Sequence, residues 1–158
     1  MRIAALALLL IPAPAAAQVL DVVGPRGQHA QMSADNLAFF PAERVSVTVG
    51  GRTRVFEGPS VAILASAMGA PQGIGLAGRE LATVLRFSGA DGRQVVLTLA
   101  EADPRFRKGR VIVAFREGGR ALPAGEGPFR LVIEDDLNPA RSGPIDMIEV
   151  LRLADDGN

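Results

Sequence analysis

Apolar and polar residues alternate in several short segments of the chain, which is the pattern of β-strands with one buried face. In residues 45–49, valines alternate with serine and threonine, and two glycines follow at residues 50–51. Two glycines suit a two-residue hairpin turn, so residues 52–56 are expected to return as a second strand. The two arginines of that strand, Arg52 and Arg54, share one face, which we expect to be the solvent face.

A second hairpin, residues 81–106, organises the middle of the chain. Its first arm, residues 81–87, is apolar on both faces, which predicts a strand that is covered on both sides. Residues 89–92, Gly-Ala-Asp-Gly, have the composition of a tight turn. The return arm leads into Thr98-Leu99-Ala100-Glu101, which has the form of a capping box and predicts one helical turn that ends before Pro104.

Helical periodicity is clearest in residues 60–69, where apolar side chains recur at three- and four-residue intervals. Ser60 is the expected N-cap, and Gly69 is suited to the left-handed position after the last turn. A shorter helix is expected over residues 34–40, capped by Ser33 and stopped by the proline that follows.

Further short apolar runs predict strands at residues 19–23, 111–115, 129–133 and 145–153. Many strands, few helices and frequent turn residues indicate an α+β fold, a β-rich domain with a mixed sheet. We expect one domain over residues 18–154, followed by a frayed tail at residues 155–158.

The first 17 residues, MRIAALALLLIPAPAAA, have the form of a secretory signal peptide. Arg2 precedes an apolar run, and small residues end at Ala17, so the mature chain is expected to begin near Gln18. A membrane-spanning helix is the alternative, but the run is short and is interrupted by Pro12 and Pro14. We therefore expect a periplasmic or secreted protein with no membrane anchor after cleavage.

Composition narrows the chemistry available to this chain of 158 residues. Acidic and basic residues number 17 each, a balance that argues against a nucleic-acid partner. The chain contains no Cys, Trp or Tyr, which excludes disulfides, thiolate metal ligands and cysteine nucleophiles.

Three segments resemble the small secreted proteins related to the molybdopterin-binding domain of sulfite oxidase-type enzymes. The first is the Ala-Asp-Gly turn followed by LAEADPRF, and the second is EGPSVAILASAMGAP. The third is a Leu-Pro pair and then Gly-Pro-Phe-Arg-Leu-Val-Ile. These segments occur in the family's order and imply the β-rich mixed-sheet fold of the molybdopterin-binding domain.

The resemblance also implies a molybdenum–pterin cofactor whose metal is held by one cysteine, placed on or just after the strand of residues 45–51. No cysteine occurs there or elsewhere. Because Ser46 or Thr48 would be a poor substitute for a thiolate, we expect no catalytic residue, no metal and no molybdenum catalysis. Molybdopterin could still bind without catalysis, by resemblance only.

Other candidate residues have simpler structural interpretations. His29 lies in a polar stretch and is expected to be a solvated loop residue rather than a base. Glu101 and Asp103 could serve acid–base chemistry, but capping and turn roles explain them better. The motif at residues 73–78 reads G-x-G-x-x-G, yet a helix precedes it and a strand follows it, which does not match a dinucleotide site.

The polar loop of residues 134–143 is the predicted binding edge, together with the segment of residues 104–110. Arg141 can pair with a carboxylate or phosphate in a two-pronged way, and Asp136 and Asn138 could orient it. The alternative is that Arg141 forms only a surface ion pair with Asp135 or Asp136.

Three functions follow from these observations. The leading hypothesis is an exported binding or accessory module without molybdenum catalysis, whose partner is a periplasmic protein or a small anionic ligand. The alternative is an oxidoreductase that binds molybdopterin without a cysteine ligand. The third is a small-ligand or structural domain that shares only the fold.

Overall fold

The computed structural model describes residues 18–137 and 139–153. The predicted signal peptide, Asn138 and the predicted tail lie outside these residues. The described helices are α1 (Ala34–Leu37), α2 (Val61–Ala67) and α3 (Leu99–Ala102), with 3-10 turns η1 (Gly73–Gly75), η2 (Gly78–Ala82) and η3 (Pro139–Arg141). The strands are β1 (Leu20–Val23), β2 (His29–Met32), β3 (Ala42–Val49), β4 (Arg52–Pro59), β5 (Thr83–Ser88), β6 (Gln94–Thr98), β7 (Val111–Ala114), β8 (Arg116–Glu117), β9 (Arg120–Ala121), β10 (Arg130–Ile133), β11 (Gly143–Pro144) and β12 (Met147–Arg152).

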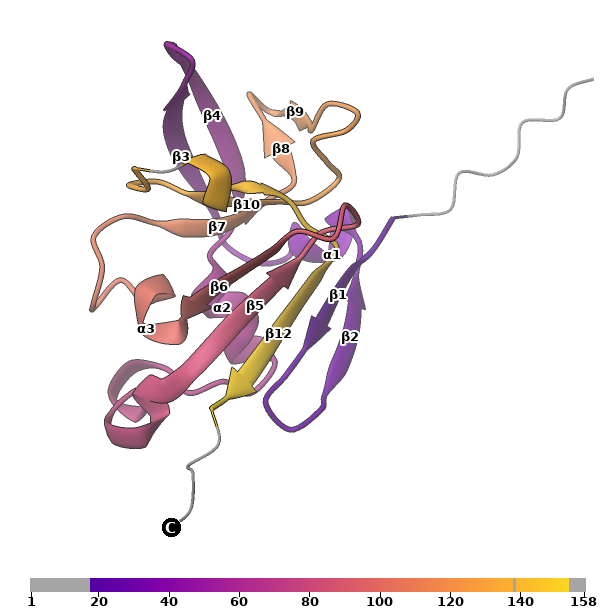
Figure 1. Ribbon diagram of the computed structural model, residues 1–158. Coiled ribbons are helices and arrows are strands. Elements are labelled where there is room, and N and C mark those ends of the chain that lie inside the picture. The colour runs from indigo at the N-terminus through magenta and orange to yellow at the C-terminus, as the bar shows by residue number, and fades with distance from the viewer. Residues whose placement is uncertain (1–17, 138, 154–158) are drawn as a thin grey trace, which may run out of the picture.

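The largest sheet has five strands in the order β2-β1-β12-β5-β6 (Figure 1). The first and the last strands of the chain, β1 and β12, are parallel, and their other neighbours in the sheet are antiparallel. A mixed sheet with few short helices is consistent with the α+β class that the sequence predicts.

One face of this sheet covers the main core, with buried residues that include Leu85, Phe87 and Val150. The opposite face is only partly covered, because Val84 and Arg86 are intermediate in exposure. The expectation that the first arm of the central hairpin is covered on both sides is therefore wrong. Its apolar residue Leu81 belongs to η2 and is 40% exposed, so it is not a core residue.

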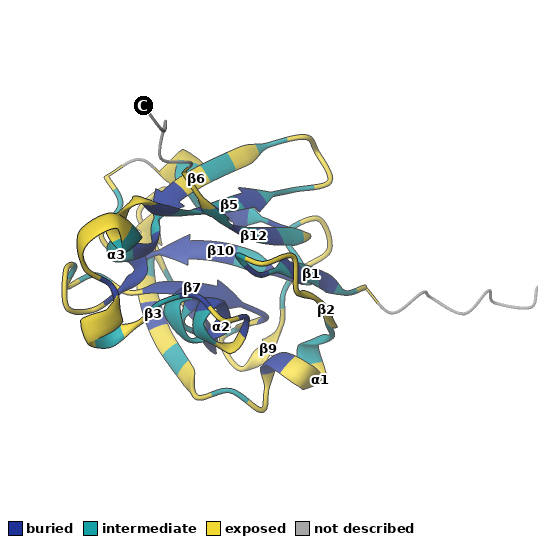
Figure 2. Cartoon of the chain, turned by 90° about the horizontal axis from the view of Figure 1, so that it is seen from below, coloured by how far each residue is buried: buried dark blue, intermediate teal, exposed yellow. Residues whose placement is uncertain are grey.

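Two smaller sheets form the other half of the molecule, in the orders β3-β4-β8-β9 and β11-β10-β7. Figure 2 shows buried residues in dark blue along β7 and β10 at the middle of the molecule. A second, smaller core joins the two sheets, and its buried members are Val45, Phe56, Ile112, Ala114 and Val132. The hairpin of β3 and β4 stands out from the body of the molecule with its tip away from the five-stranded sheet (Figure 1).

Local sequence signals explain where the helices begin and end. Ser60 caps α2 through its side chain, and Gly69 takes a φ of 84°, so both predicted helix boundaries are confirmed. Thr98 and Glu101 form the predicted capping box of α3. Helix α1 begins after Ser33 as expected but ends at Leu37, three residues before the predicted end.

The glycine-rich segment after α2 is more regular than a plain loop. It forms η1 and η2, and it buries Leu76 against the main core. No strand leads into it and no α-helix follows it, so the geometry of a dinucleotide site is absent from this segment. No helix in the described part of the chain is long and apolar enough to cross a membrane.

Candidate functional site

The best candidate for a site is a pocket of about 450 Å³ beside the β3–β4 hairpin, here called the hairpin pocket. It lies between the hairpin, β10 and the loop of residues 134–142. Its lining residues are Val47, Thr48, Val49, Arg54, Phe56, Arg130, Val132, Ile133, Glu134, Asp136, Leu137, Pro139, Ala140 and Ser142. A concave site that combines apolar walls with a few polar groups is typical of ligand-binding pockets.

Strand alternation provides the apolar wall of the pocket. Val45, Val47 and Val49 occupy every second position of β3 and therefore share one face. Val45 is buried in the smaller core, Val47 is partly buried, and Val49 is 42% exposed. The valine row thus runs from the core outward along the wall of the hairpin pocket.

Arg54 lies on the same face of the hairpin, and its guanidinium is held by two carboxylates. It donates to both oxygens of Glu117 at 2.7 and 2.6 Å and to Glu126 at 2.7 Å. Its guanidinium carbon also lies 4.8 Å from the centre of the Phe56 ring. The hydrogen bonds to Glu117 and Glu126 raise the pKa of Arg54, and the hydrogen bond from Arg54 lowers the pKa of Glu117. The side chain is only 22% exposed, so the expectation that Arg54 points to solvent is wrong.

Arg130 begins β10 and lies near the same aromatic ring. It donates from Nη1 to Glu126 at 3.2 Å, and its guanidinium lies 5.6 Å from the centre of the Phe56 ring. Burial lowers the pKa of Arg130, and the positive charges of Arg54 and Arg93 add to this effect. The buried Nε of Arg130 has no hydrogen-bond partner among the described residues.

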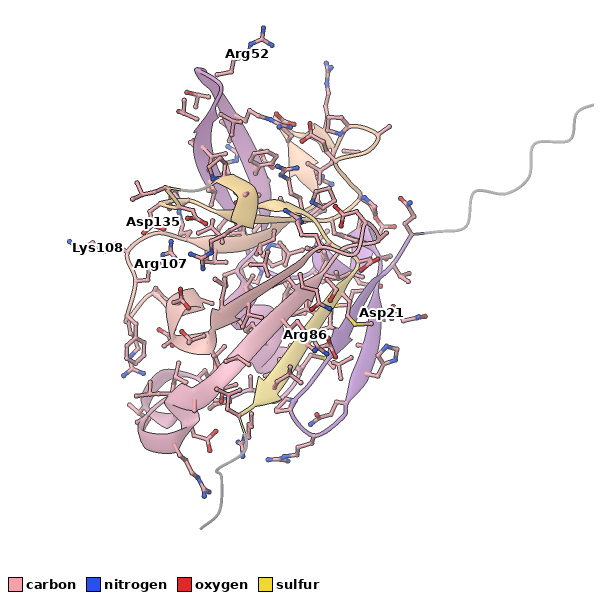
Figure 3. All side chains as sticks on the ribbon, in the orientation of Figure 1. Asp21, Arg52, Arg86, Arg107, Lys108 and Asp135 are labelled. Carbon is pink, nitrogen blue, oxygen red and sulfur yellow. The ribbon has the colours of Figure 1, made fainter. Side chains whose placement is uncertain are left out.

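Ion pairs also hold the acidic start of the loop. Glu134 accepts two side-chain hydrogen bonds from Arg110, at 2.9 and 2.6 Å. Asp135 accepts from Arg107, and Figure 3 shows these two side chains next to each other. The hydrogen bonds from Arg110 and Arg107 lower the pKa values of Glu134 and Asp135, respectively. The loop and the segment of residues 104–110, which the sequence analysis paired, therefore lie side by side.

Of the predicted ligand-binding residues, only Asp136 is among the described residues that line the hairpin pocket. Asp136 lines the pocket, and its Oδ2 lies 3.5 Å from Nε of Arg141. Arg141 also donates to Glu101 at 3.4 Å. The ion pair that is the structural alternative for Arg141 is thus present with Asp136, whereas Asn138 lies outside the described residues. Binding by these residues stays a prediction.

Glu101 serves the helix cap and the loop together. Burial acts to raise the pKa of Glu101, but hydrogen bonds from Thr98 and from Arg141 outweigh it, so the pKa is lowered. His29 lies on the surface and contacts Asp21 at 3.0 Å, and it is not among the residues that line the hairpin pocket. It begins strand β2, so the expectation that it is a loop residue is wrong. In the described part of the chain, no group of three or more histidines and carboxylates is placed to hold a metal ion.

Sequence reasoning missed the wall and the two arginines of the pocket. Residues 45–56 were predicted only as a hairpin, with no role in a site. A signal for Arg130 was present, because it is a charged residue next to the apolar run of a strand that is otherwise buried. That signal could have identified Arg130 as a residue with a specific partner, because a buried charge is stable only when it is paired.

The comparisons with known proteins support the fold and leave the activity open. No family model matches the sequence, and no curated protein matches it. The solved structure of the sulfane dehydrogenase SoxCD from Paracoccus pantotrophus is similar, with a TM-score of 0.63 at 13% sequence identity. The match covers 92% of this chain and 41% of the SoxCD chain.

At 13% sequence identity, this likeness is one of fold. The chain spans less than half the length of the SoxCD chain that it matches. The activity in the SoxCD name therefore belongs to that protein.

Proposed function

We propose that this chain is an exported binding module that works through the hairpin pocket without molybdenum chemistry. One observation carries the proposal. The strand on which the resemblance expects the metal-binding cysteine does border a pocket, and there it presents Val47, Thr48 and Val49.

These residues do not fit a molybdenum cofactor. Molybdenum held by dithiolene sulfurs takes a soft, charged protein ligand, and neither a valine nor a threonine hydroxyl is one. The arginines that line the pocket, Arg54 and Arg130, are already paired with carboxylates, so they do not form a free cationic cluster for the phosphate of a pterin.

The charges of the pocket are already balanced within the chain. Arg54 and Arg130 contact Glu126, Glu134 contacts Arg110, and Asp136 contacts Arg141. Such compensated pairs suit a binding surface better than a catalytic centre, because a catalytic group needs a charge or proton that is free to act on a substrate. Asp136, Asn138 and Arg141 remain the proposed polar edge of this surface.

Metal analysis of the protein purified from the periplasm of its own cells tests the proposal. We expect molybdenum far below one atom per chain and no pterin released on denaturation. Stoichiometric molybdenum would instead support the alternative, an oxidoreductase that holds molybdopterin without a cysteine.

The same sample tests export. N-terminal sequencing is expected to begin at or near Gln18, because small residues precede this position. A chain that retains Met1 in the cytoplasmic fraction would refute export and leave the metal result to be judged separately.

A further inference from the structure

Strand β3 has one side that pairs with no other strand in the described structure. It is the first strand in the order β3-β4-β8-β9, and its only partner there is β4. The hairpin also stands out from the body of the molecule (Figure 1), and Arg44, Ser46 and Thr48 of β3 are exposed.

The hairpin geometry shows which backbone groups face outward. Val49 pairs with Arg52 across a two-residue turn, and both turn glycines have positive φ, at 57° and 77°. Such a turn is closed by a hydrogen-bonded pair, and bonded pairs then alternate along the ladder. The backbone groups of Val45 and Val47 therefore form hydrogen bonds with β4, whereas the backbone amides of Arg44, Ser46 and Thr48 point away from β4.

Hydrogen bonds on the far side of β4 support this assignment. The carbonyls of Val55 and Glu57 accept from the amides of Gly118 and Phe115, at 2.9 and 3.1 Å. The backbone N–H and C=O groups of Val55 and Glu57 therefore point away from β3. Ser46 and Arg44 are their cross-strand partners, so the backbone N–H and C=O groups of Ser46 and Arg44 point away from β4.

The open edge lies directly beside the hairpin pocket. Proteins commonly protect edge strands with proline, lysine or a bulge. Residues 45–49 contain no proline or lysine, and their register with β4 is continuous. An added strand would continue the sheet and place every second side chain against Val47, Val49 and the apolar wall of the pocket.

We propose that an extended segment of a partner protein adds to the outer edge of β3 and fills the hairpin pocket with alternate aliphatic side chains. This mode of recognition takes affinity from main-chain hydrogen bonds and specificity from pockets for alternate side chains. The proposal rests on the proposed function, because it names the partner of the same site.

Charge and size favour such a segment over other occupants. The charges that line the pocket are compensated, so the side chains that enter it are uncharged. At the hairpin tip, Arg52 extends outward and has no carboxylate within ion-pair distance among the described residues (Figure 3), so an acidic residue suits the ends of the segment. A second copy joined along this edge of about 20 Å would fall short of the roughly 1,000 Å² that a stable interface needs.

Binding of a labelled synthetic peptide to the full chain tests the proposal by fluorescence anisotropy. The probe is a blocked peptide of about seven residues in which valine and threonine alternate, with glutamate at each end. We expect saturable binding that Ser46→Pro or Thr48→Pro weakens about tenfold or more, because each variant removes one outward amide. Replacing the terminal glutamates by lysines is expected to weaken binding at low salt.

Val96→Pro is the matched control. Val96 lies on the edge strand β6, it is 56% exposed, and its register with Arg86 places its amide away from β5. We expect a change of less than about twofold in peptide binding for this variant. Far-UV circular dichroism checks that each proline variant is folded. Val47→Glu is an independent test, because it alters the pocket wall and keeps every backbone amide, and we expect it to weaken peptide binding as well.

Three results would overturn the proposal: no saturable binding by the wild-type chain, equal loss in Ser46→Pro and Val96→Pro, or unchanged binding in Val47→Glu. Sedimentation that shows a dimer broken by Ser46→Pro would assign the edge to a second copy instead. None of these results alters the molybdenum content, so the proposed function is judged separately.

Discussion

At Gly58, strand β4 lies close against β7 of the three-stranded sheet, and Gly58→Ala tests that contact. A methyl group on Gly58 would lie 1.9 Å from the carbonyl oxygen of Val113 and 2.9 Å from Cα of Ala114. Both are backbone atoms of β7, which is buried and paired with β10. The neighbouring strand therefore cannot yield by rotating a side chain.

The size of the effect follows from this geometry. Reaching an ordinary contact requires β4 and β7 to separate by about 1.5 Å or more, and overpacking of this kind costs about 1–3 kcal/mol or more. Replacing glycine also lowers the conformational entropy of the unfolded chain, which offsets about 0.4–1 kcal/mol of this overpacking cost. Because the overlap is with backbone atoms, the cost lies at or above the upper end of that range, and we expect a net loss of about 2–3 kcal/mol in the free energy of unfolding. The corresponding fall in Tm is roughly 4–12 °C for a domain of this size.

Urea unfolding followed by far-UV circular dichroism is the assay, because the chain has no Trp or Tyr for fluorescence. Gly75→Ala is the matched control, since nothing lies within 4 Å of a methyl group there. It should change the free energy of unfolding by no more than about 0.5 kcal/mol. Equal stability of Gly58→Ala and the wild-type chain, or equal damage by both variants, would refute the reasoning.

Three further predictions concern the core and the ion pairs. Leu64→Asp should destabilise the protein by about 3 kcal/mol or more, because Leu64 is buried in α2. The control Ala67→Asp, on the exposed side of the helix, should cost less than about 1 kcal/mol. A wild-type Tm for Leu64→Asp would contradict this prediction. Arginine partners lower the pKa values of four carboxylates, which are Glu117, Glu134, Asp135 and Glu149. These ion pairs should therefore stabilise the folded protein above about pH 4, and this stabilisation should be lost as the pH falls through the folded-state pKa values. Urea midpoints that stay constant down to about pH 3 would count against this prediction. Arg141→Ala should lower the free energy of unfolding by at most about 1 kcal/mol, because its ion pairs are long and partly exposed, and a larger loss in the urea assay would show that Arg141 holds the loop.

Local signals in the sequence were sufficient for most of the fold. Serine and threonine caps, a glycine after α2 and alternating valines each act over a few residues, so their consequences can be predicted without the rest of the chain. The end of α1 and the 3-10 turns before β5 were missed. They depend on packing against distant strands rather than on local preference.

The candidate site was harder to predict because it depends on contacts between distant segments. The polarity of residues 134–143 and of residues 104–110 was enough to indicate this loop and its neighbour. The hairpin side of the pocket could not be predicted, because alternation alone cannot show which face of residues 52–56 is buried. Arg54 is covered because Glu117 and Glu126, more than 60 residues away, meet it there.

Backbone amide exchange in β3 tests the central claim most directly, namely that the edge of β3 and the hairpin pocket form the working surface. Val45 and Val47 donate to β4 and should exchange slowly, whereas Ser46 and Thr48 should exchange rapidly in the free protein. Saturation with the valine–threonine peptide should slow exchange at Ser46 and Thr48 and leave Val96 on β6 unchanged. Slow exchange at Ser46 and Thr48 in the free protein, or rates that the bound peptide does not change, would contradict the account.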